Sequence, residues 1–144
     1  MVNRILVALD GSEPAGRALA LAVDLAVKYG AALHLVHVIS HPVALKGLEE
    51  FARVERVDAV ELAGIDESIL AAARAHAAGK GVQSLHTDAL TGDPAEQLLG
   101  YARDHGIDLI ALGRRGLGRI RGLLIGSVSL KVNSLAECPV LTVR

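Results

Sequence analysis

The chain has 144 residues, of which 51% are hydrophobic and 22% charged, and its formal net charge is −1. This length is typical of one compact domain, and the apolar content is sufficient for a core without disulfides or a structural metal. A charge so close to zero argues against a protein whose whole surface binds nucleic acid. Aromatic residues make up only 2%, which argues against a module that stacks bases on aromatic side chains. No direct nucleic-acid binding is expected.

Cysteine content and hydropathy point to a cell compartment. The single cysteine, Cys138, rules out an internal disulfide and fits a reducing environment. The apolar run near the start is too short for a signal peptide and is interrupted by Asp10. No run reaches the roughly 18 apolar residues of a membrane span. These features predict a soluble cytoplasmic protein without membrane insertion.

The apolar pattern predicts strands that alternate with helices. Residues 4–9 form a continuous apolar run, which is typical of a strand buried on both faces of a parallel sheet. Ser12 is a good N-cap for a helix that ends near Gly30. A second strand is expected over residues 33–39. After a loop, residues 48–78 have a helical composition.

The second half of the chain continues this alternation. Gly64 either divides the long helical stretch or lies inside a single helix. The remaining elements are a half-exposed third strand at residues 82–89, a helix that Asp93 caps and that ends near His105, a fourth strand at 108–112, a helix at 127–136 and a last strand at 139–143.

Strict alternation of this kind predicts an α/β fold, in which helices cover both faces of one open, parallel, five-stranded sheet. No linker or repeat divides the chain, so residues 1–144 are expected to form a single domain. Ligands of such sheets bind at the carboxyl ends of strands where the strand order reverses. In the order 3-2-1-4-5, the strand ends at Asp10 and Gly113 would meet in one crevice.

A basic, glycine-studded stretch follows the fourth strand. It contains Gly113, Gly116 and Gly126, and Ser127 follows at the expected start of a helix. Each glycine alone could serve an ordinary turn, but together they gather backbone N–H groups and a helix dipole where a phosphate could bind. Ser127 could cap the helix and also bind a phosphate oxygen, and Ser129 could do the same. The spacing fits neither a Walker A loop nor the GxGxxG motif.

Charged residues border the same crevice. Asp10 could position a ribose or a metal ion bound to phosphates, or it could accept a hydrogen bond within the turn. The basic cluster of Arg114, Arg115, Arg119 and Arg121 could neutralise phosphates or only keep the loop soluble. Arg115 is the strongest candidate because it lies inside the glycine motif.

Histidine and cysteine offer less chemistry. His34 and His37 are three residues apart on an expected strand, so their side chains point to opposite faces. The other four histidines are scattered along the sequence, and no histidine metal site is expected. Cys138 has the features of a small buried residue rather than those of a nucleophile.

The segment from Gly113 to Ser127 has the form G-x2-G-x9-G-[ST]. Together with VALDGS near the start, TGDPAEQLL before the fourth strand and ECPVLTVR at the end, it resembles the universal stress protein (UspA-like) family over essentially the whole chain. The resemblance implies an adenine nucleotide alpha hydrolase-like fold with strand order 3-2-1-4-5. It also implies a homodimer, here through the apolar edge strand Val140 to Val143.

The glycine motif marks the subgroup of that family that binds ATP. The resemblance therefore implies a nucleotide-sensing regulatory protein of the stress response, and not a conventional enzyme. Alternatives are a slow ATPase or self-phosphorylating protein, and an interaction module for AMP or another adenylate. Val38 would meet the adenine through its backbone, and Asp10 could reach a nucleotide-bound Mg²⁺. The residues that match the family's nucleotide contacts are Leu9, Asp10, Val38, Leu112, Gly113, Arg115, Gly116, Gly126, Ser127, Val128 and Ser129.

Overall fold

A computed structural model describes residues 1–40, 59–115 and 126–144, with residues 59–63 and 65 described by their backbone only. Five parallel strands form one sheet in the order β3-β2-β1-β4-β5, so the predicted fold class and strand order are confirmed. The elements are β1 (Arg4–Leu9), α1 (Glu13–Tyr29), β2 (Ala32–Ile39), α3 (Ala59–Gly79), β3 (Leu85–Thr91), α4 (Pro94–Asp104), β4 (Leu109–Gly113), α5 (Ser127–Leu135) and β5 (Val140–Val143).

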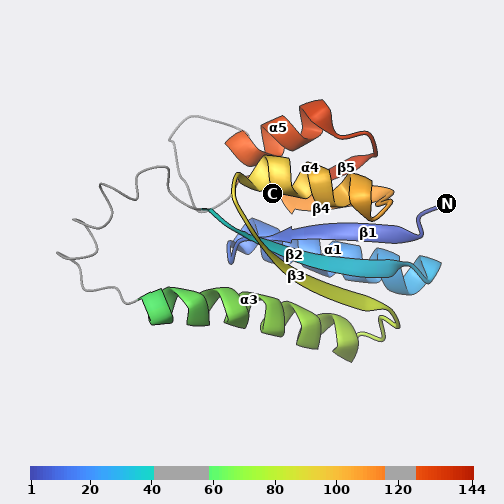
Figure 1. Ribbon diagram of the computed structural model, residues 1–144. Helices are drawn as coiled ribbons and strands as arrows, with labels where there is room; N and C mark the ends of the chain where they lie inside the picture. Colours follow the sequence, from blue (N-terminus) through green and yellow to red (C-terminus); the bar gives the residue numbers. More distant parts are fainter. Residues whose placement is uncertain (41–58, 116–125) are drawn as a thin grey trace.

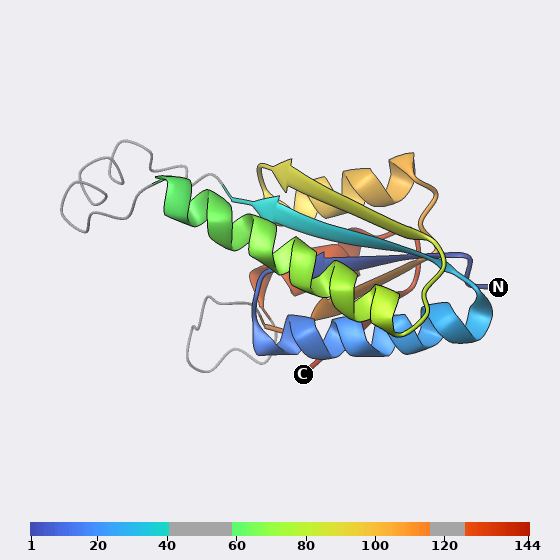
Figure 2. The ribbon, with the colours of Figure 1, turned by 90° about the horizontal axis from the view of Figure 1, so that it is seen from below.

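The helices lie in two layers, one on each face of the sheet (Figure 1). Helices α1 and α3 cover the face that comes forward in Figure 2, whereas α4 and α5 lie behind the sheet in that view. Each layer buries its own hydrophobic cluster against the sheet. Among the described residues, no helix combines the length and the apolar character that a bilayer crossing needs.

Strand β1 shows why a continuous apolar run forms the centre of this sheet. Ile5, Val7 and Leu9 pack into the cluster under α1 and α3, whereas Leu6 and Ala8 face the cluster under α4 and α5. Successive side chains of a strand point to opposite faces, so a strand covered on both faces must be apolar at every position.

Side-chain caps begin two of the helices where the sequence predicts them. The Ser12 hydroxyl accepts a hydrogen bond from the Ala15 N–H at 3.3 Å, and Asp93 Oδ1 accepts one from the Glu96 N–H at 2.9 Å. Helix α1 ends at Gly30, whose φ of 66° is left-handed and favours glycine.

The third strand differs from its prediction. It begins at Leu85, because the chain at Val82 is still completing the end of α3: the Val82 N–H bonds the Ala77 carbonyl at 3.2 Å. The Val82 side chain is nevertheless buried in the cluster under α3, which explains its strand-like apolar pattern. Gly64 lies within α3, so it does not divide the helix. The loop and the first part of the helical stretch expected before residue 59 lie outside the described residues.

Candidate functional site

The carboxyl ends of three adjacent strands form the edge at which the sequence places a ligand. Strand β1 pairs with β4 on one side and with β2 on the other. This arrangement brings together five of the predicted site residues, which come from strand ends far apart in the sequence. They are Leu9, Asp10, Val38, Leu112 and Gly113.

The apolar residues predicted to bind the nucleotide, including Val128 on α5, contribute backbone rather than side chains to the edge. The Leu9 side chain packs into the cluster under α1 and α3. The side chains of Val38, Leu112 and Val128 pack into or against the cluster under α4 and α5. Any ligand at this edge would therefore meet their N–H and C=O groups.

Gly113 is held by packing against the start of α1. A Cβ at this position would lie 2.9 Å from the Ala15 nitrogen and 2.9 Å from the Pro14 Cβ. Contacts this short do not occur between real side chains, so only glycine lets β4 approach α1 so closely. The first glycine of the motif therefore has a structural reason for its identity.

Asp10 performs the turn role that was one of its two predicted roles. Its Oδ1 accepts a hydrogen bond from the Ser12 N–H at 2.9 Å, across Gly11, whose φ is 79°. Its Oδ2 has no hydrogen bond to a described residue. One carboxylate oxygen thus holds the turn, and the other is available for a ribose hydroxyl or a cation.

The two ends of the glycine loop are tied together. The Arg114 carbonyl accepts hydrogen bonds from the Gly126 N–H and from the Ser129 hydroxyl, both at 2.7 Å. The Arg114 N–H bonds the Val143 carbonyl of β5 at 2.6 Å. Ser129 is only 2% exposed, and its hydroxyl hydrogen is already used within the protein. Ser129 therefore offers a ligand its backbone N–H rather than its hydroxyl hydrogen.

Helix α5 begins differently from α1 and α4. Its N-cap is Gly126, with φ −73° and ψ 160°, and no side chain caps it. Ser127 is the first helical residue and is exposed, so the prediction that Ser127 caps the helix is wrong. The first helical hydrogen bond runs from the Leu130 N–H to the Gly126 carbonyl at 2.9 Å. The N–H groups of the three residues between them have no intrahelical acceptor.

Arg115 directly follows Arg114, whose carbonyl is bonded to the start of α5, and it is a cation with an unused donor. Its side chain is half-buried, and its buried Nε has no hydrogen-bond partner among the described residues. A buried N–H without an acceptor is costly, so the position favours an anionic or carbonyl acceptor. Gly116, Arg119 and Arg121 lie outside the described residues.

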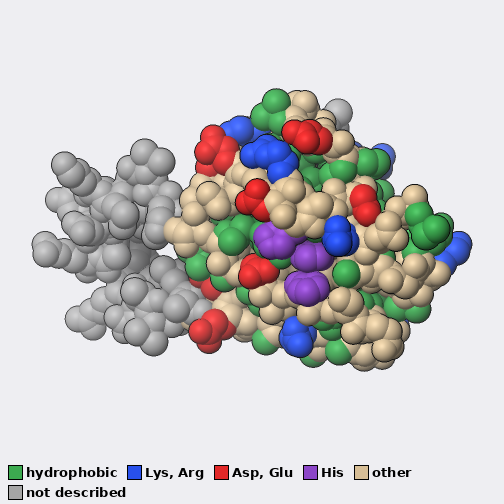
Figure 3. All heavy atoms as spheres, turned by 45° about the vertical axis from the view of Figure 1, so that its right-hand side comes forward, with side chains coloured by type: hydrophobic (Ala, Val, Ile, Leu, Met, Phe, Trp, Pro, Cys, Tyr) green, Lys and Arg blue, Asp and Glu red, His purple; other side chains and the backbone are tan. Residues whose placement is uncertain are grey.

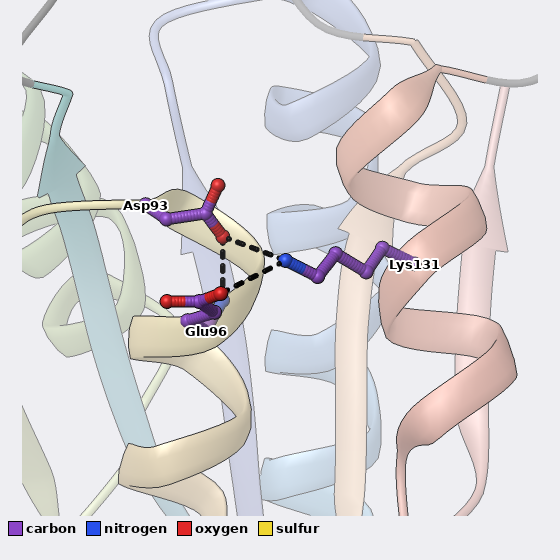
Figure 4. A network of polar contacts seen from close by, with 3 residues as sticks. All are labelled: Asp93, Glu96 and Lys131. Atoms are coloured by element: carbon purple, nitrogen blue, oxygen red, sulfur yellow. Dashed lines mark hydrogen bonds and ion pairs between the residues drawn. The ribbon is translucent and has the colours of Figure 1, made fainter. Parts of the chain in front are cut away.

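A polar contact that sequence reasoning missed joins α4 to α5 beside this edge (Figure 4). Lys131 Nζ lies 3.4 Å from Asp93 Oδ1 and 3.2 Å from Glu96 Oε1. The backbone hydrogen bond from Glu96 and then the Lys131 ammonium hold the pKa of Asp93 below its usual value. The partners are 38 and 35 residues apart in sequence, so no local spacing signals the contact.

A second group of residues that the sequence did not connect lies away from this edge. Histidine side chains gather on one face of the molecule (Figure 3). His34 stacks on His86 with ring centroids 4.4 Å apart, and the His105 ring is 5.8 Å from His34. The Tyr101 hydroxyl donates to Asp88 Oδ2 at 2.6 Å and lies 3.0 Å from His34 Nδ1. The prediction that the histidines other than His34 and His37 are scattered is thus wrong for His86 and His105, whereas His34 and His37 do face opposite sides.

The pKa values of two groups in this cluster are displaced. Burial, reinforced by the neighbouring imidazoles of His86 and His105, lowers the pKa of His34 to about 4. Burial and then the hydrogen bond to Asp88 raise the pKa of Tyr101. Both groups are therefore uncharged near neutral pH.

The sheet order and the uncapped helix at its carboxyl edge define an open α/β protein with its candidate ligand site at the end of β1 and β4. The chain belongs to the universal stress protein family, whose model matches residues 1–144. It is 40% identical over 152 residues to the universal stress protein YxiE of Bacillus subtilis (strain 168), with 100% of each chain covered.

Solved structures agree with this fold. Universal stress protein UspA from Lactobacillus plantarum superimposes with a TM-score of 0.81 at 28% identity, covering 99% of this chain and 98% of that chain. A universal stress protein crystallised in complex with cAMP has a TM-score of 0.74 at 24% identity, covering 99% of this chain and 97% of that chain.

Proposed function

We propose that this protein binds an adenine nucleotide, with ATP as the leading candidate, at the carboxyl edge of β1 and β4, and that it acts as a nucleotide-sensing regulatory protein. The observation that carries the proposal is the uncapped start of α5. There, three N–H groups have no intrahelical acceptor, and the Arg114 carbonyl bonds the Gly126 N–H. The next residue is the half-buried cation Arg115, whose Nε also lacks a partner among the described residues.

This combination suits phosphate oxygens. A helix N-terminus carries a partial positive charge and directs its free N–H groups outward, so it favours an anion. An adjacent guanidinium can add a charge-assisted hydrogen bond. In this proposal the phosphates are bound by Ser127, Val128 and Ser129 through their backbone N–H groups and by Arg115.

The nucleoside would lie along the ends of β1 and β2. The backbone at Leu9 and Val38 can read the edge of a base without aromatic stacking, in agreement with the low aromatic content. The Oδ2 atom of Asp10 suits a ribose hydroxyl or, through the phosphates, a Mg²⁺ ion. A universal stress protein with the same fold was crystallised in complex with cAMP, so adenylates are the first ligands to test.

Two further features belong to this proposal. The free edge of β5 would pair with a second copy of the chain to form a homodimer, and the protein would act in the cytoplasm. Residues 1–144 would fold as one domain. Self-phosphorylation, slow ATP hydrolysis and a preference for AMP are the alternatives; the following experiments distinguish the last two from the main proposal.

Isothermal titration calorimetry with ATP, ADP, AMP and cAMP tests the proposal when it is applied to the wild type and to Gly126→Asp. The φ of Gly126 is one that any residue adopts, and Asp is a preferred N-cap, so the variant is expected to fold. Its carboxylate would accept the free N–H groups and repel phosphates. We expect the ATP affinity to fall by about 100-fold, which corresponds to about 2.7 kcal/mol.

The matched control is Leu135→Asp, which places the same charge at the other end of α5, on a side chain that is 57% exposed. Its ATP affinity should equal that of the wild type. The proposal is wrong if the wild type neither releases heat with millimolar adenylates nor gains thermal stability from them. Equal affinity for ATP and AMP would favour the adenylate module, and phosphate release that Asp10→Ala abolishes would favour the ATPase.

A further inference from the structure

His37 connects three elements behind the proposed nucleotide site. Its ring is on β2 and is only 7% exposed. Its Nδ1 lies 2.7 Å from the carbonyl oxygen of Leu9, the last residue of β1, and its Nε2 lies 2.7 Å from Oδ1 of Asp66 on α3. Both ring nitrogens are thus bonded to oxygen atoms of other elements.

The chemistry of these partners fixes the hydrogens. A carbonyl oxygen only accepts, so Nδ1 of His37 must carry a hydrogen and donate it to Leu9. The 2.7 Å contact with Asp66 then needs a second proton between Nε2 and the carboxylate oxygen. The ring is therefore held on both sides: Nδ1 donates to the Leu9 carbonyl, and Nε2 shares a hydrogen with the Asp66 carboxylate.

The position of this pair relates it to the edge of the sheet. Leu9 and His37 are partners in the register of β1 and β2, and Val38 follows His37 directly. Helix α3 also contacts the turn after β1, since a Cβ on Gly11 would lie 3.1 Å from Ile69 Cδ1. The conformation of the turn after Leu9 therefore depends on where α3 lies.

Packing alone supports this turn incompletely on that side. An open groove of about 360 Å³ lies between α1 and α3, and its lining includes Leu9, Gly11 and Ile69. Side chains that line this groove have no packing partner across it. Directional hydrogen bonds such as those of His37 then contribute more to the position of the strand end.

We propose that His37 and Asp66 are positioning residues of the nucleotide site, which hold the Leu9–Asp10 corner against α3 in the geometry that binds the nucleoside. The inference rests on the proposed function. Neither side chain is proposed to touch the ligand: His37 shares its face of β2 with Leu33 and Leu35, which pack under α1 and α3, and Asp66 lies on α3. They act through the Leu9 carbonyl and the turn that follows it.

Two substitutions at Asp66 separate the hydrogen bond from its charge. In Asp66→Asn, a neutral His37 can still donate from Nδ1 to Leu9, while the new amide donates to Nε2. In Asp66→Ala, nothing replaces the partner of Nε2. The asparagine variant should therefore keep the geometry, and the alanine variant should lose it.

Calorimetry with ATP and with AMP provides the first readout. Asp66→Ala should lower both affinities by the same factor of about ten, since the corner contacts the nucleoside that both ligands share. Asp66→Asn should bind both as the wild type does. In the ¹⁵N spectrum of the imidazole, Nδ1 of His37 should carry hydrogen both in the wild type and in Asp66→Asn. Loss of ATP affinity alone, or equal losses in the two variants, would overturn the proposal.

A second readout needs no nucleotide and separates this inference from the proposed function. The Ser12 N–H is bonded to Asp10 in the turn, and its hydrogen exchange reports whether the corner is held. Exchange should be faster in Asp66→Ala than in the wild type and unchanged in Asp66→Asn. If all three proteins exchange alike, His37 and Asp66 do not hold the Leu9–Asp10 corner, and the proposal is wrong. If the wild type binds no nucleotide but the exchange rates differ as expected, only the proposed function fails.

Discussion

At the scale of single residues, His34 shows how burial controls ionisation. Its ring is 5% exposed, its Nδ1 is 3.0 Å from the Tyr101 hydroxyl, and its pKa is lowered to about 4. The Tyr101 hydroxyl donates to Asp88, so it must accept from His34, which fixes a hydrogen on Nδ1 of the neutral ring. Protonation would leave this hydrogen bond in place but would add a positive charge to a buried ring beside two other imidazoles, which is what lowers the pKa.

This displacement predicts a loss of stability in acid. The pKa of His34 in the folded protein lies below its ordinary value of 6.5, so between about pH 6.5 and pH 4 the unfolded chain binds more protons than the folded one. His34 therefore contributes up to about 3 kcal/mol to the free energy of unfolding. This contribution is complete above pH 6.5 and is lost as the pH falls to about 4.

Urea denaturation at several pH values in this window measures the effect. His34→Gln should show a flatter pH dependence than the wild type, because it removes the displaced group. His76→Gln, which changes an exposed histidine on α3, should keep the wild-type slope. Equal slopes in all three proteins would show that His34 does not carry the linkage.

At the scale of elements, the packing of β4 against α1 depends on Gly113. A Cβ there would lie 2.9 Å from the Ala15 nitrogen, so Gly113→Ala should force the helix away from the strand. We expect a destabilisation of about 1–3 kcal/mol in urea denaturation. Gly100→Ala is the control: its Cβ would meet nothing within 4 Å, and alanine favours the α4 helix.

The two glycine variants should thus change stability in opposite directions. If Gly113→Ala is as stable as the wild type, the close packing of β4 on α1 does not require glycine. The glycine would then have to be explained by the ligand alone.

Most of the fold could be predicted because its signals are local. The apolar run at residues 4–9, the cap at Ser12 and the cap at Asp93 each lie within a few residues of the element they define. The start of β3 could not be predicted in this way. Val82 is apolar because it packs under α3, and only the three-dimensional structure shows that its N–H belongs to the end of that helix.

The candidate site also has features that the sequence predicts and features that it does not. The sequence predicts which strand ends meet, because topology follows from the alternation of elements. It does not predict that Ser129 ties the loop through its hydroxyl, or that Gly113 is a packing glycine. The contacts of His37 with Leu9 and Asp66 span 28 and 29 residues, so no short-range pattern reports them.

At the scale of the whole molecule, the two edges of the sheet predict how the chain assembles. The Pro139 carbonyl accepts from Ile110 of β4, and the Val143 carbonyl accepts from Arg114, which follows β4. Residues alternate along a parallel strand, so the Thr142 backbone faces the open edge of β5. Thr142→Pro removes its outward N–H without removing a ladder bond, which proline tolerates at an edge. We expect a dimeric wild type and a monomeric variant in light scattering after size exclusion.

The opposite edge offers a matched control. The Ser84 carbonyl accepts from Leu33 of β2 and the Gly92 N–H donates to Ile39, so Thr87 faces the open edge of β3. Thr87→Pro should leave the dimer intact. A wild type that is monomeric at all concentrations, or a dimer that only Thr87→Pro disrupts, would contradict assembly through β5.

The central claim is that an adenine nucleotide binds at the uncapped start of α5. Titration of ¹⁵N-labelled protein with ATP, followed by amide NMR, tests it most directly. The amide signals of Ser127, Val128 and Ser129 should shift most and should saturate together. Absence of any shift would contradict it. So would the largest shifts among residues that line the cavity of about 240 Å³ between α4 and α5, such as Ile107 and Cys138.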